Sequence, residues 1–334
     1  MKDILKNETR TDDIYRVASL EYDWEKLNGK TLLISGGTGF IGSAIIDVVK
    51  CRNEKFGNSI RVISLSRHAR EDEAGVRYLA CDVTEEINVP YPVDYILHLA
   101  SNTHPAQYAK DPVGTIETNV AGCNNLLKLA IKKEAKRFLL ASSVEIYGQC
   151  EARPVDETYC GYIDCNTARA GYNEAKRVCE SLTQSYRSQY GIDAVTVRLA
   201  RCFGEDKTKK DTKAMAQFMD CARNGEDIVL KSKGEQRFSY CYYADAVSAI
   251  FKVLLDGADG EAYNVADDDD GSDLAAIASY LAALCGTKVV FDLQNAVVGA
   301  SKATFALLNC DKLKKLGWTP LFTLKEGLRR SIGG

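Results

Sequence analysis

From Thr31 onward, short apolar runs alternate with longer segments whose apolar residues have helical spacing. The short runs predict strands and the longer segments predict helices. We expect strands at 31–35, 60–65, 76–80, 95–100, 137–142 and 194–199, and helices after Gly42, over 115–133 and over 172–189. Strands separated by helix-length segments predict an α/β fold with a doubly wound parallel sheet covered by helices on both faces.

The two ends of the chain follow a different pattern. Residues 1–29 are charged and carry apolar residues at helical spacing, namely Ile14, Val17, Leu20 and Trp24, which predicts an N-terminal helical extension packed beside the first strand. The main domain is expected over 30–200, with about 240–265 returning to it. Residues 201–239 and 266–334 are assigned to a smaller C-terminal lobe that binds substrate. The acidic run 267–270 is expected to be a solvated turn.

Composition narrows the class of protein. The 334 residues carry 43 basic and 46 acidic side chains, a near balance that gives no reason to expect nucleic acid or a membrane as partner. The first residues are too polar for a signal peptide, and no apolar run approaches the roughly 20 residues of a membrane span. Twelve cysteines without a Cys-x-x-Cys pair suggest reduced thiols in a cytoplasmic protein, and three histidines without ligand-like spacing indicate no metal site.

A glycine-rich turn lies between the first expected strand and the first helix. It reads Ser-Gly-Gly-Thr-Gly-Phe-Ile-Gly over 35–42, with glycines at 36, 39 and 42, or alternatively at 37, 39 and 42. Glycine permits a tight turn and close backbone approach to a pyrophosphate, which the following helix N-terminus then attracts. We therefore expect a Rossmann-type dinucleotide site formed by Gly36, Gly39, Phe40, Ile41 and Gly42.

The second expected strand leaves the type of dinucleotide open. An acidic residue at its end would hold the adenosine ribose and favour NAD. Here the strand ends in Ser66 and Arg67, with Arg70 close behind, and a hydroxyl and an arginine could instead receive the 2′-phosphate of NADP. An ordinary exposed arginine is an equal alternative. The expected cofactor is therefore NAD(P).

Three further residues have the types that a hydride-transfer site needs. Tyr172 and Lys176 are four residues apart on an expected helix and so share one face. A nearby ammonium, together with a nicotinium, stabilises a phenolate that can take a proton from a sugar hydroxyl. Ser143 ends a strand about thirty residues earlier and can hydrogen-bond the same oxygen.

At this point the sequence resembles the extended short-chain dehydrogenases/reductases, the NAD-dependent epimerase/dehydratase family that acts on nucleotide-sugars. The resemblance covers nearly the whole chain after Lys30. Its motifs are Gly-Gly-Thr-Gly-Phe-Ile-Gly at 36–42, Asp82-Val83, His98-Leu99-Ala100-Ser101, Asn119, Ser-Ser-Val-Glu-Ile-Tyr-Gly at 142–148, Tyr-Asn-Glu-Ala-Lys at 172–176 and Leu-Gly-Trp-Thr-Pro at 316–320.

The resemblance implies roles for these residues. It makes Ser143, Tyr172 and Lys176 the catalytic triad and adds Glu145 near the sugar. Asp82 and Val83 are expected at the adenine, and Arg237 at the substrate diphosphate. The remaining cofactor contacts are expected from Leu99, Ala100, Ser101, Asn119, Tyr172 and Lys176.

Within the family, residues 168–178 are similar to the triad helix of the UDP-glucuronate decarboxylases, and residues 105–108 with Asp111-Pro112 look like their substrate-side loop. A 4,6-dehydratase keeps an aspartic acid just before the glutamate, to protonate the leaving hydroxyl. The matching residue here is Val144, which cannot donate a proton and so argues against 4,6-dehydration.

Two features depart from the family pattern. Arg201 stands where an asparagine usually touches the substrate, and it could meet a substrate carboxylate or the diphosphate, or else pair with Glu205 or Asp206. Residues 159–167, which include Cys160 and Cys165, have no clear counterpart. We expect a surface insertion there, with a substrate-facing loop as the alternative.

The expected activity is C4 oxidation of a UDP-sugar followed by decarboxylation, in an enzyme similar to a UDP-glucuronate decarboxylase. The alternative is 4-epimerisation of UDP-glucuronate or a UDP-hexose, which uses the same triad. A reading from another class is an NAD(P)-binding sensor without catalysis, although such proteins commonly lose the tyrosine or lysine. By resemblance we also expect a homodimer formed by helices 115–133 and 172–189, and a role in making polysaccharide precursors.

Overall fold

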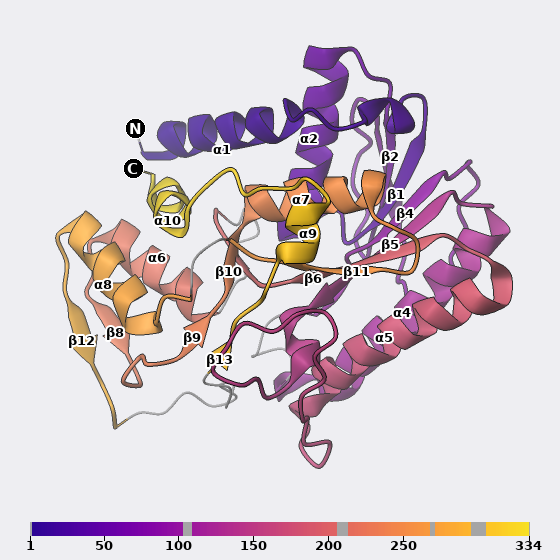
Figure 1. Cartoon of the computed structure of the whole chain (residues 1–334). Helices are drawn as coiled ribbons and strands as arrows, with labels where there is room; N and C mark the ends of the chain where they lie inside the picture. The colour runs from indigo at the N-terminus through magenta and orange to yellow at the C-terminus, as the bar shows by residue number, and fades with distance from the viewer. Residues whose placement is uncertain (1, 103–108, 206–212, 268–270, 295–304, 334) are drawn as a thin grey trace.

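The computed structural model describes residues 2–102, 109–205, 213–267, 271–294 and 305–333. Its centre is a seven-stranded sheet in the order β11-β6-β5-β4-β1-β2-β3, in which every neighbouring pair is parallel (Figure 1). The strands are β1 (Thr31–Ser35), β2 (Arg61–Ser66), β3 (Val76–Ala80), β4 (Tyr95–His98), β5 (Arg137–Ser143), β6 (Ala194–Leu199) and β11 (Ala262–Val265). The expected doubly wound α/β sheet is confirmed.

Helices cover both faces of this sheet. On one face α2 (Phe40–Phe56) packs beside α7 (Tyr243–Asp256), and on the other α4 (Pro112–Lys132) lies along α5 (Ala170–Tyr190). The inner strands are buried almost throughout, as β1 is at all five positions, because they lie between two helical layers, whereas the edge strand β3 is buried only at Val76. The predicted return of the chain to the main domain near 240–265 corresponds to α7 and β11.

A smaller lobe lies to one side, at the left of Figure 1. It contains α6 (Ala214–Asn224) and α8 (Leu274–Cys285), with the parallel pair β8 (Ile228–Leu230) and β12 (Val289–Phe291). Short parallel pairs join it to the main domain. These are β7 (Arg201–Phe203) with β10 (Tyr240–Tyr242), and β9 (Arg237–Phe238) with β13 (Phe305–Ala306).

The N-terminal extension forms α1 (Lys2–Ala18) and the 3-10 turn η1 (Trp24–Leu27). The expected helices are present, but α1 packs on α2 and α7 and not beside the first strand, because those helices already cover the sheet. Its buried Asp13 accepts hydrogen bonds from the hydroxyls of Tyr242 (2.6 Å) and Tyr243 (2.9 Å) and from Arg330 Nε (2.7 Å). One carboxylate thus ties α1 to both α7 and the C-terminal helix.

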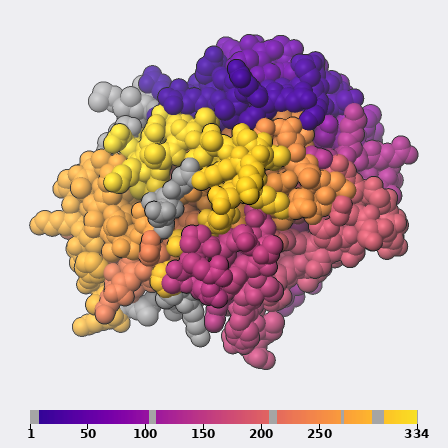
Figure 2. All heavy atoms as spheres, in the orientation of Figure 1, coloured from indigo at the N-terminus to yellow at the C-terminus, as the bar shows by residue number. Residues whose placement is uncertain are grey.

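The C-terminal segment forms α9 (Asp311–Lys315) and α10 (Leu324–Ile332). Figure 2 shows it lying across this face of the molecule, between the N-terminal helix and the segment near residues 150–165. Trp318 is fully buried, and its indole N–H donates to Ser248 Oγ of α7 at 2.9 Å. The final residues therefore pack partly on the main domain, although the sequence assigns all of 266–334 to the smaller lobe.

All twelve cysteines are free thiols, as the sequence predicts.

The acidic run that begins at Asp267 differs from its prediction. Asp267 is only 6% exposed, and its backbone N–H donates to Tyr240 O at 2.8 Å, so the expectation of a solvated residue there is wrong. The chain enters the interior at this point because it runs from β11 past β10; residues 268–270 lie outside the described residues. Among the described residues, no helix is long and apolar enough to cross a membrane.

Asp245, at the start of α7, generates a prediction about stability. It is fully buried, its Oδ1 accepts the N–H of Leu321, and its Oδ2 has no hydrogen-bond partner among the described residues. Burial raises its pKa from 3.8 to about 7. The folded protein therefore holds a proton that the unfolded chain releases above about pH 4, and each pH unit between 4 and 7 costs up to about 1.4 kcal/mol of stability.

We expect Asp245→Asn to remove this pH dependence. The melting temperature of the variant, relative to wild type, should rise between pH 5 and pH 8 in differential scanning fluorimetry. Asp256→Asn on the same helix is the control, because Lys252 and Lys26 lower the pKa of Asp256. Its difference from wild type should stay constant over that range. Parallel melting curves for Asp245→Asn and wild type would contradict the prediction.

Candidate active site

The candidate site lies where β1, β4 and β5 end at the same edge of the sheet. Strand β1 is flanked by β2 on one side and β4 on the other, so the chain reverses its winding direction at this point. Crevices outside the carboxyl ends of parallel strands at such a switch point bind ligands. Ser35, His98 and Ser143 end these three strands.

The glycine turn 36–42 has the close backbone approach that its sequence predicts. A Cβ on Gly36, which has φ +75°, would lie 2.9 Å from Ala100 N, and a Cβ on Gly42 would lie 2.2 Å from Gly36 O. Helix α2 then begins at Phe40, with Gly39 as its N-cap and no side-chain cap. Its first N–H groups are therefore not capped by a side chain, and the turn fits the pyrophosphate of a dinucleotide.

The residues expected around the adenosine lie beyond β2 and β3. Ser66 Oγ donates to His68 O at 2.6 Å, and Arg67 is exposed. Asp82 is exposed, and hydrogen bonds from the backbone and side chain of Thr84 lower its pKa, so it is an ionised acceptor. Val83 next to it is buried.

The loop after β4 is fixed by polar side chains. Ser35 Oγ accepts the N–H groups of Leu99 and Ala100, each at 3.2 Å, which turns the chain out of the sheet after His98 and ends β4 two residues earlier than expected. Ser101 Oγ then donates to Asn119 Oδ1 at 2.9 Å. The expected cofactor residues 99–101 and 119 are thereby brought together beside the glycine turn.

Helix α5 is held against the end of β5 by three side chains that donate to backbone carbonyls. Asn173 Nδ2 reaches Glu145 O at 2.7 Å, Lys176 Nζ reaches Ala141 O at 2.9 Å, and Arg177 Nε reaches Ile146 O at 2.7 Å. These three donors lie within about one helical turn. As a result, the Tyr172 hydroxyl lies within hydrogen-bonding reach of Ser143, and Lys176 is one turn further along the same helix.

Burial controls the titration of Tyr172. It raises the pKa of this buried hydroxyl to about 12, whereas hydrogen bonds with Ser143 and Ser101 lower it and the charge of Glu145 raises it. Lys176 Nζ lies 6.0 Å from the Tyr172 ring centroid, and burial lowers the lysine pKa. In the protein alone Tyr172 is therefore a phenol, and more positive charge is needed to make it a base.

Glu145 forms an ion cluster that the sequence did not predict. Its carboxylate accepts Arg169 Nη2 at 2.8 Å and Arg201 Nη2 at 3.3 Å. Burial alone would raise the Glu145 pKa, but Arg201 and Arg169 outweigh it and lower the pKa. Glu205, one of the two alternative partners of Arg201, is therefore not its partner, because β7 directs Arg201 toward Glu145. Asp206 lies outside the described residues.

The other expected substrate residues lie farther out. Arg237 on β9 is exposed, and its Nε donates to Gly271 O at 2.8 Å. Residues 159–167 are mostly exposed, as a surface insertion would be, and Arg177 Nη2 holds the segment through Gly161 O at 2.7 Å. The expected substrate-side residues 105–108 lie outside the described residues.

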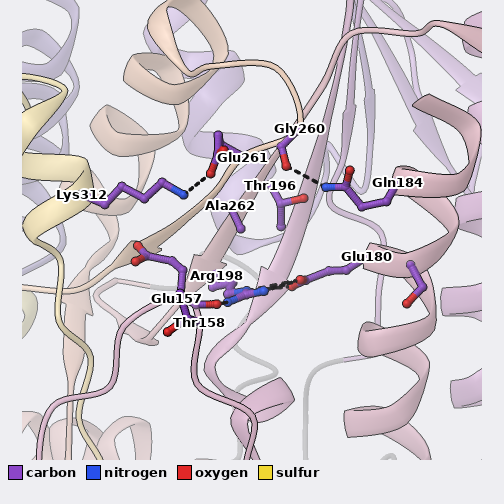
Figure 3. A pocket seen from close by; sticks show the side chains of 11 residues that line it. Glu157, Thr158, Glu180, Gln184, Thr196, Arg198, Gly260, Glu261, Ala262 and Lys312 are labelled. Carbon is purple, nitrogen blue, oxygen red and sulfur yellow. Dashed lines mark hydrogen bonds and ion pairs between the residues drawn. The ribbon is translucent and has the colours of Figure 1, made fainter. Parts of the chain in front are cut away.

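A separate pocket lies at the other end of the sheet order, beside β6 and β11 (Figure 3). Its two basic side chains are each paired with an acidic one, and the Glu157 carboxylate accepts the N–H of Asn264. Arg198 bonds Glu180 at 2.7 Å, and Lys312 pairs with Glu261. Because these groups already satisfy each other and the pocket is away from the switch point, it is not the candidate active site.

Sequence comparison identifies relatives of the chain. Residues 32–266 match the NAD dependent epimerase/dehydratase family. The UDP-glucuronic acid decarboxylase 3 of Arabidopsis thaliana is 31% identical over 306 residues, which are 89% of this chain and 86% of that protein.

Solved structures share the fold. The UDP-glucose 4-epimerase of Thermotoga maritima with UDP-glucose has a TM-score of 0.79 at 23% identity, over 90% of this chain and 97% of that one. The UDP-glucose 4-epimerase of Thermus thermophilus, in complex with NAD, has a TM-score of 0.74 at 21% identity, over 90% and 97%.

Proposed function

Because the chain belongs to the NAD dependent epimerase/dehydratase family, we propose that it is a UDP-glucuronate decarboxylase that first oxidises the sugar at C4. The observation that carries this proposal is the meeting of Tyr172, Lys176 and Ser143 at the end of β5, beside a glycine turn suited to a dinucleotide. The similarity to UDP-glucuronic acid decarboxylases, over 86% of one of them, supports the choice of substrate.

In this proposal Tyr172 is the general base. It takes the proton of the C4 hydroxyl, while Ser143 orients that oxygen and Lys176 adds positive charge that favours the phenolate. When bound, the dinucleotide supplies the hydride acceptor and a further positive charge next to the phenol. Asn173 and Arg177 keep the helix in register, so that the tyrosine hydroxyl stays beside Ser143.

The carbon dioxide is lost from a β-keto acid. Oxidation at C4 places a ketone next to C5, which carries the carboxylate. The C5–C6 bond breaks, carbon dioxide leaves, and the bond's electron pair moves toward the ketone as an enolate. A proton from water then adds at C5, which gives the 4-keto pentose, and return of the hydride to C4 would give the UDP-pentose. Val144 is buried beside Ser143 and has no proton to donate, which supports this outcome over 4,6-dehydration.

The second candidate is 4-epimerisation. It uses the same base and the same oxidation, and differs in which face of the keto-sugar is reduced. The UDP-glucose 4-epimerase of Thermotoga maritima shares the fold of this chain at 23% identity, so the fold is compatible with this second reaction.

We propose NAD as the cofactor, since the family is NAD dependent. The Ser66 hydroxyl donates its hydrogen bond to His68 O, so Arg67 is the remaining group that would favour NADP. The two dinucleotides are separated in the product experiment below.

Incubation of the purified protein with UDP-glucuronate and either NAD or NADP should release carbon dioxide and give a UDP-pentose or its 4-keto form. Mass spectrometry of the nucleotide fraction checks this outcome, and the more active dinucleotide identifies the cofactor. An unchanged mass with a new anomeric NMR signal would instead establish epimerisation. No change with either dinucleotide would exclude this substrate.

Replacing the proposed base should separate catalysis from binding. We expect Tyr172→Phe to lower turnover by about 10²–10⁴-fold, because it removes the general base, while dinucleotide affinity stays within about twofold. Tyr186→Phe on the same helix, whose hydroxyl bonds Asn124 Oδ1, is the matched control and should keep its activity. A protein that binds the dinucleotide but shows no turnover even as wild type would support the sensor alternative.

We further propose that the chain is a homodimer formed through α4 and α5. Apolar side chains are exposed on these helices, including Ile116 (43%) and Val178 (41%). We expect Val178→Arg to yield a monomer by size-exclusion chromatography with light scattering. Val229→Arg in the smaller lobe, at a residue of similar exposure (45%), should leave the dimer intact. A monomeric wild-type protein would refute the proposal.

A further inference from the structure

An ion cluster of Glu145, Arg169 and Arg201 lies beside the proposed base. Two guanidinium groups share one carboxylate, so the cluster carries one positive charge in excess. Since the arginines keep Glu145 ionised, that charge is not removed near neutral pH. An excess positive charge in a mostly buried site is stabilised by an anion that binds beside it.

Arg201 is the member of the cluster with donors to spare. A guanidinium has five N–H donors, yet the side-chain contacts of Arg201 in the described part of the chain are one hydrogen bond of 3.3 Å to Glu145 and stacking on the Phe238 ring at 3.6 Å. Its Nη1 is buried without a hydrogen-bond partner among those residues. The side chain is thus held in one plane while most of its donors remain unused.

The position of the cluster indicates which anionic group of the substrate it would bind, the sugar carboxylate or the diphosphate. Glu145 follows Ser143 by two residues, its N–H donates to Ser143 Oγ at 3.3 Å, and its charge acts on Tyr172. The cluster is therefore next to the two hydroxyls that would hold the C4 oxygen of the sugar. In a hexuronate the carboxylate is attached to C5, the carbon adjacent to C4, so it would lie on the same side as these groups.

The sequence assigns the substrate diphosphate to a different arginine. Arg237 belongs to a different strand, β9, and is exposed, whereas Arg201 is in the mostly buried cluster beside the base. A planar guanidinium also matches a carboxylate in a bidentate manner. Both observations favour the sugar end of the substrate as the partner of Arg201.

We infer that Arg201 binds the sugar carboxylate of a hexuronate substrate and selects it over a neutral hexose, with Glu145 and Arg169 as positioning residues. The inference rests on the proposed function for the identity of the nucleotide-sugar. It assigns a role to the residue at which this chain departs from the asparagine of the family pattern.

The test is isothermal titration of the NAD-loaded protein with UDP-glucuronate and, separately, with UDP-glucose. Arg201→Met keeps an unbranched side chain on Phe238 but removes the charge. We expect it to weaken UDP-glucuronate binding by about tenfold or more and UDP-glucose binding by less than about twofold. Arg201→Lys should retain part of the preference for the uronate. Arg153→Met, at an exposed arginine that pairs with Glu151, is the control and should change neither affinity.

An equal loss for both ligands in Arg201→Met would overturn the inference, because it would mean that Arg201 binds the diphosphate. Unchanged binding of UDP-glucuronate, or equal wild-type affinities for the two ligands, would overturn it as well. Wild-type protein that prefers UDP-glucuronate, loses that preference in Arg201→Met and yet releases no carbon dioxide would sustain this inference while refuting the decarboxylase proposal. Melting temperatures of the variants check that each is folded.

Discussion

The attachment of helix α5 to the end of β5 is the constraint on which the site depends. Three side chains within about one turn of the helix donate to carbonyls of residues 141, 145 and 146, so the helix can take only one register along the strand. That register puts the phenol beside Ser143 and leaves the opposite face of the helix to α4 and the surface. It also fixes the backbone of Glu145, from which the ion cluster is built. Binding chemistry and helix packing are therefore set by the same hydrogen bonds.

The features predicted well from sequence depend on short-range order. Strands β1, β3 and β6 have the predicted bounds, because each is a short run of mostly apolar residues. Tyr172 and Lys176 share a face because four residues make about one helical turn. The glycine turn was predicted from the spacing of its glycines between a strand and a helix, and the structure gives the reason, because a Cβ at Gly36 or Gly42 would meet backbone atoms.

The features that sequence did not predict depend on contacts between distant segments. Arg201 pairs with a glutamate 56 residues earlier, and that pairing follows from where β7 leaves the main sheet. Arg169 was part of a recognised motif, yet nothing in its spacing indicates that it shares Glu145 with Arg201. The burial of Asp267 likewise follows from its contact with β10, and the packing of α1 follows from the two helices, α2 and α7, that already cover the sheet. Local periodicity carries no information about these contacts.

The carboxylate of Asp13 has a consequence for how the chain matures. It belongs to the first helix, but its partner Arg330 follows 317 residues later in the chain. At ribosomal speeds of roughly 5–20 residues per second, Arg330 is synthesised on the order of tens of seconds after Asp13. The dinucleotide domain can assemble during this interval, before the ion pair between Asp13 and Arg330 forms. The contact between α1 and α10 can therefore form only after every residue between Asp13 and Arg330 has been made.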